Sequence, residues 1–260
     1  MLMVSAILVM VLYCSVAFVQ YLELTGRIVS NDLIFFSLGS AAVVLHALLL
    51  YRWIDLPAGQ NLSALNMLSF AIWLSAGIIL CSTIRQPLQN LTIFVFPLAA
   101  LSVVLALLFP GHSIIETAQH PKQLIHILSA VAAFSMLCMA GFQGLLLSIQ
   151  EYLLRHKYRG NIVKRLPPLE TMEHLLFQMV WFGFFLLTLV LISSVYFFHE
   201  LFSSPPLMQK ALLTLAAWII FAMLLAGRYF FGWRGRRVTY YTLSGVSLLI
   251  MIYFSSQLLT

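Results

Sequence analysis

Histidines are the side chains of this sequence that are best placed to do chemistry. His46 and His126 lie within long apolar stretches, and His199 directly follows a third. An ionisable side chain inside an apolar segment is a functional candidate, and neutral imidazole is a ligand for iron, copper and zinc and an axial ligand of haem. All eight acidic residues, in contrast, lie outside the central parts of these stretches. The sequence therefore points first to a ligand-binding site built from imidazole.

Long apolar segments must position these rings. The chain is 62% hydrophobic and only 8% charged, whereas about a quarter of the residues of a soluble domain are charged. About 20 apolar residues cross the hydrocarbon core of a bilayer as a helix. Eight such segments occur: Leu2–Leu22, Leu33–Arg52, Leu65–Thr83, Leu91–Phe109, Leu124–Leu153, Leu175–Phe198, Ala211–Phe230 and Tyr240–Leu259. The predicted fold is all-α, a polytopic integral membrane protein in which residues 1–260 form a single membrane-embedded domain.

The distribution of lysine and arginine predicts the orientation. Of the 14 basic residues, all but Arg52, Lys122 and Lys210 lie in or beside the loops after the first, third, fifth and seventh segments. Short basic loops stay in the cytoplasm, so both termini are predicted to be extracytoplasmic, in the inner (plasma) membrane of a bacterium. The first segment lacks a preceding basic residue and a clear cleavage site, so we expect a mature helix rather than a signal peptide.

This orientation brings most histidines to or near the outer face of the membrane, namely His46, His112, His120, His126 and His199. The net charge of +6 is explained by basic cytoplasmic loops, which anionic lipid headgroups attract. We therefore expect the lipid bilayer, and not nucleic acid, to be the partner of the positive charge.

Several classes of function are disfavoured by missing residues. The sequence has no G-x-S-x-G, H-E-x-x-H, Walker or Rossmann pattern, so we expect no enzyme. No carboxylate is predicted near mid-membrane, which disfavours ion-coupled carriers and sites for hard metals. Cys14, Cys81 and Cys138 lie singly in three segments, so no redox dithiol or thiolate zinc site is predicted, and we expect these cysteines to pack.

Two segments allow a binding interpretation beside a structural one. Along the helix that contains His126, most residues on the same face are small: Ala130, Ala133, Ala140 and Gly144. Another helix or a flat ligand could approach this face, and ordinary helix packing is favoured. The polar segment Asp55–Ser63 could bind a ligand through its amides, but an ordered turn at the membrane interface is favoured.

Four stretches carry a more specific pattern: Gly59-Gln60-Asn61-Leu62-Ser63 with Leu65-Asn66; Leu124-Ile125-His126-Ile127; Pro167-Pro168-Leu169 with Glu173; and Ala217-Trp218 followed by Gly232-Trp233-Arg234-Gly235-Arg236-Arg237-Val238. In their order, their spacing and the number of helices around them, they resemble the cytochrome c assembly membrane proteins. The resemblance is to the CcsA/HemX-like branch of small bacterial inner-membrane proteins and spans nearly the whole chain.

The resemblance implies a role for His126. Haem-handling members of that family have a tryptophan-rich external loop flanked by external histidines that ligate haem, and His126 matches the first flanking position. The corresponding loop, between Tyr196 and Lys210, contains no tryptophan and no aspartate, and Tyr253–Ser256 lacks a histidine for the second position. His199 or His46 could replace the missing ligand.

The resemblance also implies a function. It predicts an accessory integral membrane protein of cytochrome c or haem biogenesis that binds haem near the extracytoplasmic face. Its partners would be cytochrome c maturation or tetrapyrrole-pathway proteins. The alternative is a regulatory or scaffolding membrane protein, HemX-like and tetrapyrrole-linked, that binds a partner protein through its cytoplasmic basic loops without a cofactor.

Overall fold

The computed structural model is built from long helices, and it describes residues 2–29, 31–57, 59–111, 113–115, 121–157, 161–197 and 205–258. Within these ranges, eight helices are long and apolar enough to cross a membrane, which confirms the predicted all-α polytopic fold. They are α1 (Leu2–Leu24), α2 (Asp32–Ile54), α3 (Ala64–Ser82), α4 (Thr92–Leu108), α5 (Pro121–Arg155), α7 (Leu169–Phe197), α8 (Pro205–Phe231) and α9 (Arg236–Leu258). A short helix, α6 (Asn161–Arg165), and a 3₁₀ turn, η1 (Gln89–Leu91), lie between them.

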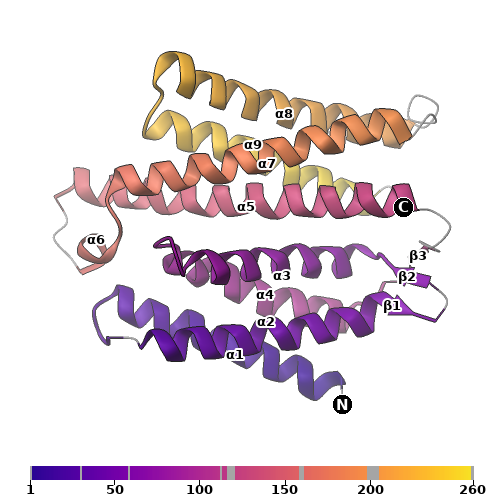
Figure 1. Ribbon diagram of the computed structural model, residues 1–260, viewed down its shortest axis with the longest axis horizontal. Helices are drawn as coiled ribbons and strands as arrows, with labels where there is room; N and C mark the ends of the chain where they lie inside the picture. Colours follow the sequence, from indigo (N-terminus) through magenta and orange to yellow (C-terminus); the bar gives the residue numbers. More distant parts are fainter. Residues whose placement is uncertain are drawn as a thin grey trace. The chain divides into compact units, whose positions relative to one another are not determined.

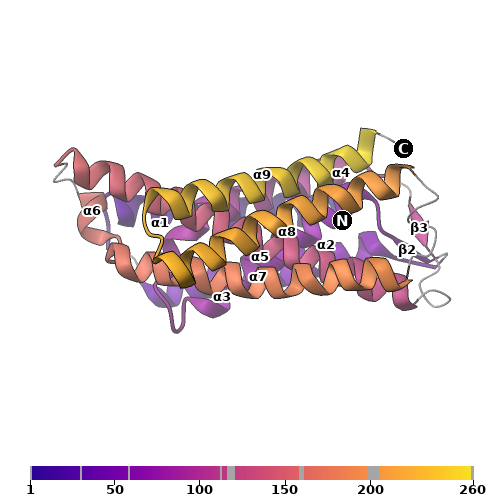
Figure 2. The ribbon, with the colours of Figure 1, turned by 90° about the horizontal axis from the view of Figure 1, so that it is seen from above.

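The chain forms two compact units, each a bundle of four long helices. Unit 1 comprises residues 1–119 and 159–167, and unit 2 comprises residues 120–158 and 168–260. In unit 1 the contacts close a ring in the order α1, α2, α3, α4, and in unit 2 a ring in the order α5, α7, α8, α9. The long helices of each unit run side by side (Figure 1, Figure 2), as in a four-helix bundle. A single membrane-embedded domain and its orientation remain predictions.

A small sheet in unit 1 replaces the turn expected at Asp55–Ser63. Strands β1 (Asp55–Leu56), β2 (Gly59–Asn61) and β3 (Ile114–Ile115) pair antiparallel in that order. The Asn61 side chain holds the sheet to its surroundings, because Nδ2 donates to the Gly111 carbonyl at 2.8 Å and Oδ1 accepts from the Ser113 amide at 3.1 Å. The segment is ordered as expected, but it forms paired strands where a turn was predicted, and its position at a membrane interface remains a prediction.

The small-residue face of α5 is filled by neighbouring helices of unit 2. Ala133 and Ala140 are buried, and the space beside Gly144 is occupied by Leu176 of α7 and by Thr239 and Thr242 of α9. Small residues allow this close approach of helices. Ordinary helix packing is thus confirmed for this face.

The packing role expected for the cysteines is wrong at two of the three positions. Cys14 of α1 and Cys81 of α3 are exposed, and only Cys138 of α5 is partly buried. Exposed apolar side chains are also numerous along the long helices. Both observations are expected of helices whose outer faces contact lipid, because the lipid provides no force that drives apolar groups inward.

The conformation of the connection between α8 and α9 accounts for the glycines and the tryptophan that it contains. Gly232 and Gly235 have φ values of +60°, a left-handed conformation that favours glycine. The Trp233 amide donates to the Gly227 carbonyl at 3.1 Å, and the Trp233 ring stacks on Tyr241 with 4.9 Å between ring centroids. The same ring lies directly against Gly227, where it leaves no room for a Cβ atom.

Substituting Gly227 with alanine is expected to destabilise the protein. The new methyl group would overlap the Trp233 ring, and overpacking of this kind costs about 1–3 kcal/mol. Gly77→Ala in α3 is the matched control, because the nearest neighbour of its new Cβ, Val43, lies at 3.9 Å. Since alanine is the better helix former, the control should be neutral or stabilising. Unfolding free energies in mixed micelles measure both effects, and equal shifts for the two variants would contradict the prediction.

Candidate functional site

The three histidines predicted as ligands fall into different parts of the structure. His46 belongs to α2 in unit 1, and His126 belongs to α5 in unit 2. His199 lies outside the described residues, as do His112 and His120. The surroundings of His46 and His126 are therefore each described within their own unit.

His46 lies at the centre of unit 1 and is completely buried. Its Nδ1 atom is 3.2 Å from the Tyr13 hydroxyl of α1, and its Nε2 atom is 2.9 Å from Ser69 Oγ of α3. Ser69 Oγ in turn lies 3.2 Å from Ser102 Oγ of α4, which donates to the Ala99 carbonyl at 2.9 Å. One chain of hydrogen bonds thus connects all four long helices of the unit.

The direction of every bond in this chain follows from its last member. A carbonyl oxygen only accepts, so the Ser102 hydroxyl donates its single proton to the Ala99 carbonyl. Ser69 must therefore donate to Ser102. His46 must then donate to Ser69 through Nε2–H, and its Nδ1 accepts from the Tyr13 hydroxyl. His46 is therefore a neutral Nε2–H tautomer with both ring nitrogens engaged. This environment is that of a satisfied core histidine.

His126 has the opposite tautomer and a more open environment. Its ring is only partly buried, and its Nδ1 atom lies 2.8 Å from Ser193 Oγ of α7. The Ser193 hydroxyl donates its proton to the Val190 carbonyl at 3.0 Å, so His126 must donate to Ser193 through Nδ1–H. In the neutral ring the lone pair is then on Nε2. Histidines that ligate metals commonly donate their other ring N–H in this way, because the bond fixes tautomer and ring orientation.

A groove lies near the end of α5 that carries His126. It has a volume of about 780 Å³ and is lined by Lys122 of α5 and by Leu191, Ile192, Val195 and Tyr196 of α7. Lys122 is one helical turn from His126, and the α7 residues flank Ser193 along the chain. The volume lies within the range of ligand pockets, about 300–1,000 Å³. The lining combines an apolar wall with one cation.

These residues fit one side of a haem site. Nε2 of His126 would be able to ligate the haem iron, and the positive charge of Lys122 at the groove would be complementary to a propionate. Among the described residues, no group of three or more histidine, cysteine, aspartate or glutamate side chains could hold a metal ion.

The sequence interpretation missed the polar partners of both histidines. Ser193 is 67 positions from His126, and Tyr13, Ser69 and Ser102 lie in three different helices. Single serines are common in transmembrane helices, so no periodicity singles them out. The adjacent pair Ser193-Ser194 within an apolar helix is the one signal that could have drawn attention to α7.

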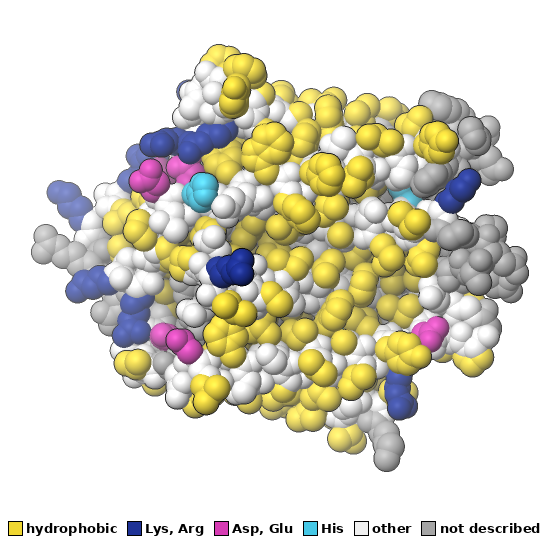
Figure 3. All heavy atoms as spheres, viewed as in Figure 1, with side chains coloured by type: hydrophobic (Ala, Val, Ile, Leu, Met, Phe, Trp, Pro, Cys, Tyr) yellow, Lys and Arg dark blue, Asp and Glu magenta, His cyan; other side chains and the backbone are white. Residues whose placement is uncertain are grey.

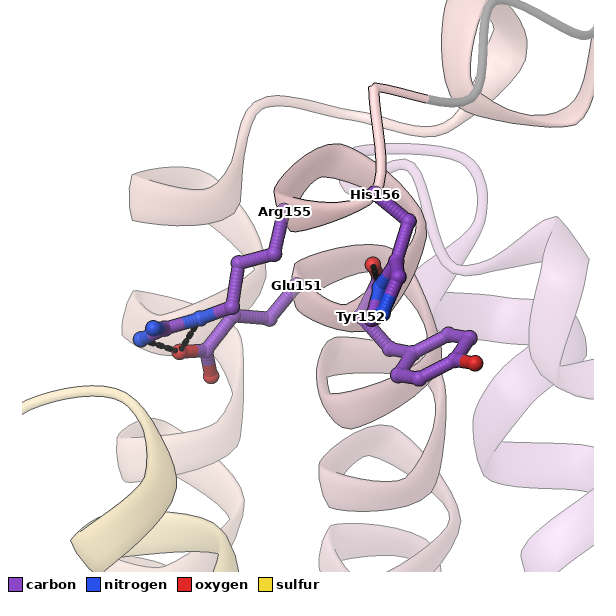
Figure 4. Close-up of polar contacts among 4 residues, drawn as sticks. All are labelled: Glu151, Tyr152, Arg155 and His156. Carbon is purple, nitrogen blue, oxygen red and sulfur yellow. Dashed lines mark hydrogen bonds and ion pairs between the residues drawn. The ribbon is translucent and has the colours of Figure 1, made fainter.

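At the end of α5, where the basic segment begins, the side chains pair with residues one helical turn away (Figure 4). Glu151 and Arg155 form an ion pair one turn apart on α5. The His156 ring lies 4.1 Å from the Tyr152 ring between centroids, and its Nδ1 donates to the Tyr152 carbonyl at 2.9 Å. In unit 1, Arg165 of α6 donates to the Glu23 carbonyl at 2.8 Å and so caps the last turn of α1. Lys157 and Lys164 are exposed.

Comparison with known proteins supports the family resemblance. The model of the family described as "Cytochrome C assembly protein" matches residues 34–260. "Inner membrane protein YpjD" of Escherichia coli strain K12 is 32% identical over 219 residues, which cover 84% of this chain and 82% of that protein. The proteins of the same name from strains O6:H1 and O157:H7 match equally well. No solved structure matches the chain.

Proposed function

Because this chain belongs to the cytochrome C assembly protein family, we propose that it is an accessory protein of cytochrome c or haem biogenesis that binds haem through His126. Its eight apolar helices and its similarity to an inner membrane protein make it a multi-pass protein of the bacterial inner membrane. The observation that carries the proposal is the Nδ1–H tautomer of His126, which Ser193 imposes.

Each residue of the proposed site has a separate task. His126 would hold haem through the lone pair of Nε2, and the haem iron would supply the coordination position that an imidazole can fill. Ser193 holds the ring at 2.8 Å through Nδ1. Lys122 adds a positive charge at the groove, where a propionate would be neutralised. The aliphatic side chains of α7 exclude water from the face of the macrocycle.

Of the two candidates for a second haem ligand, His199 and His46, we propose His199. His46 already uses both ring nitrogens within the core of unit 1, so its recruitment would leave a buried hydroxyl without its partner, at a cost of about 1–3 kcal/mol. His199 follows α7, the helix that also contributes Ser193 to the site.

The test of haem binding is spectroscopic. The full chain is purified from cells grown with a haem precursor, and its absorption spectrum is recorded. A Soret band in stoichiometric amount is expected. A protein that is folded and free of this band after such growth would overturn the haem proposal, although it would leave the family membership intact.

A regulatory or scaffolding role is the second proposal, and the exposed lysines of the segment between α5 and α7 favour it. The side chains of Lys157 and Lys164 have no hydrogen bond or ion pair within the described residues, whereas the side chains of Arg155 and Arg165 are engaged. We expect the double substitution Lys157→Glu and Lys164→Glu to abolish co-purification of a partner protein without changing any Soret band. The matched control is Lys210→Glu, at the start of α8. Retention of all partners by the double variant would exclude this role for the segment.

A further inference from the structure

A groove on α7 connects a row of exposed aromatic rings to an arginine of α8. Its apolar wall consists of Phe177, Trp181, Phe182 and Phe185, and its volume is about 610 Å³. Trp181, Phe182 and Phe185 are 61%, 53% and 57% exposed. In the part of Figure 3 that shows unit 2, most of the charged side chains gather at the end where α7 begins, and apolar side chains are numerous along the rest of the face. Polar and apolar parts of one ligand could therefore be bound together.

Arg228 is held firmly at the polar end of this groove. Its Nη1 atom donates to Glu173 Oε1 at 3.0 Å and to the Trp233 carbonyl at 3.1 Å. Its guanidinium carbon also lies 4.8 Å from the centroid of the Phe177 ring. The two bonds use both protons of Nη1. The three protons of Nε and Nη2 have no partner among the described residues, and the side chain is 33% exposed. A planar fork of free N–H groups matches the oxygens of a phosphate.

Two further side chains add donors at the same end. The Gln178 amide donates to His174 Nε2 at 3.0 Å, so the ring proton of His174 is on Nδ1. Both side chains line the groove, and both are exposed. From His174 to Phe185 the helix rises by about 16 Å, which is roughly half of the hydrocarbon thickness of a bilayer. The aromatic wall is thus long enough to accompany an acyl chain into one leaflet.

The surrounding charge favours an anion. Glu173 is the carboxylate closest to Arg228 and is already paired with it, and Arg234 also interacts electrostatically with Glu173. Arg236 and Arg237 follow at the start of α9, and two further carboxylates act on Glu173: Glu170 of α7, and Glu151 of α5, which is paired with Arg155. Positive charge therefore exceeds negative charge at this end of the two helices.

We propose that this groove binds one anionic phospholipid, with its phosphate at Arg228 and an acyl chain along Trp181, Phe182 and Phe185. Basic pockets beside membrane helices recognise anionic headgroups, and tryptophan is enriched at the depth where headgroup and acyl chain meet. The proposal does not depend on haem binding, because it involves neither His126 nor the groove beside it.

Native mass spectrometry of the delipidated full chain tests the proposal. Phosphatidylglycerol and phosphatidylcholine are added in equal amounts. Retention of one phosphatidylglycerol per chain is expected, at least about tenfold above phosphatidylcholine, a ratio that corresponds to about 1.4 kcal/mol. Arg228→Gln should reduce this preference to nearly none, and Trp181→Ala should weaken retention of both lipids. Tyr240→Ala, which removes a ring that is 73% exposed on α9, is the matched control and should change nothing.

Trp181→Ala decides the test if Arg228→Gln does not fold, because it leaves the pair of Arg228 and Glu173 intact. Equal retention of the two lipids, or retention that neither variant changes, would overturn the proposal. Displacement of the lipid by millimolar inorganic phosphate would assign the site to a soluble anion instead. A dimer that Trp181→Ala dissociates would show that a second copy of the chain covers the groove.

Discussion

Replacing His126 with alanine is expected to remove the Soret band of the purified protein. The substitution deletes the only ring nitrogen that the proposed site in unit 2 offers to iron among its described residues, whereas the groove lined by Lys122 and Tyr196 stays in place. Haem would then be left with apolar contact, the charge of Lys122 and at most the one proposed ligand His199, and we expect these to be too weak to survive purification. The measurement is the ratio of Soret to protein absorbance after size-exclusion chromatography.

Ser193→Ala should give an intermediate result. It leaves the imidazole present but removes the bond at 2.8 Å that orients the ring, and loss of such a supporting bond typically weakens metal binding 10–100-fold. His174→Ala is the matched control, because His174 is an exposed histidine of the same unit in a different groove. A Soret band that survives in His126→Ala, or one that disappears equally in His174→Ala, would contradict the ligand assignment.

Removing His46 is expected to destabilise unit 1. His46→Leu breaks two bonds of the chain that connects its four helices and leaves the buried Tyr13 hydroxyl without an acceptor. An unsatisfied buried group costs about 1–3 kcal/mol, and hydrogen bonds between membrane helices contribute about 0.6 kcal/mol on average. We therefore expect the free energy of unfolding to fall by about 1–3 kcal/mol, measured by mixed-micelle denaturation.

A double-mutant cycle with Tyr13→Phe tests whether the bond between Tyr13 and His46 contributes to stability. The double variant lacks both the Tyr13 hydroxyl and Nδ1 of His46, so neither group of this pair is left buried without a hydrogen-bond partner. Its loss of stability should therefore be close to that of His46→Leu alone, with a coupling of about 1 kcal/mol. Ser15→Ala on α1 removes a bond within one helix and should change stability by less than about 0.5 kcal/mol. Additive losses for Tyr13 and His46 would show that their bond contributes nothing to stability.

The helices could be predicted from the sequence, because uninterrupted apolar segments leave few alternatives in a membrane. The errors lie at the polar ends. The apolar segments Leu175–Phe198 and Ala211–Phe230 start later than the helices that contain them, which begin at Leu169 for α7 and at Pro205 for α8. Proline suits the first turn of a helix, and polar residues continue a helix beyond the hydrocarbon, so hydropathy alone places these starts too late.

The histidine environments could not be predicted, because they depend on contacts between distant helices. Hydropathy predicted that His46 and His126 lie in helices, but the direction of each ring's hydrogen bonds is set by Ser102 in one case and by Ser193 in the other. These serines lie 56 and 67 positions away along the chain. Two residues of the same type thus received the same interpretation although their tautomers differ.

The hydrogen bond from Arg165 to the Glu23 carbonyl bears on the biosynthesis of the protein. Residues 159–167 belong to unit 1, although α5 of unit 2 precedes them in the chain. Unit 1 therefore remains incomplete at the ribosome until α5 has been synthesised, and a fragment that stops at residue 119 lacks the arginine that caps α1. Neither unit corresponds to one uninterrupted piece of the gene, so an exchange of halves between related genes would divide a unit wherever the single junction were placed between α5 and α7.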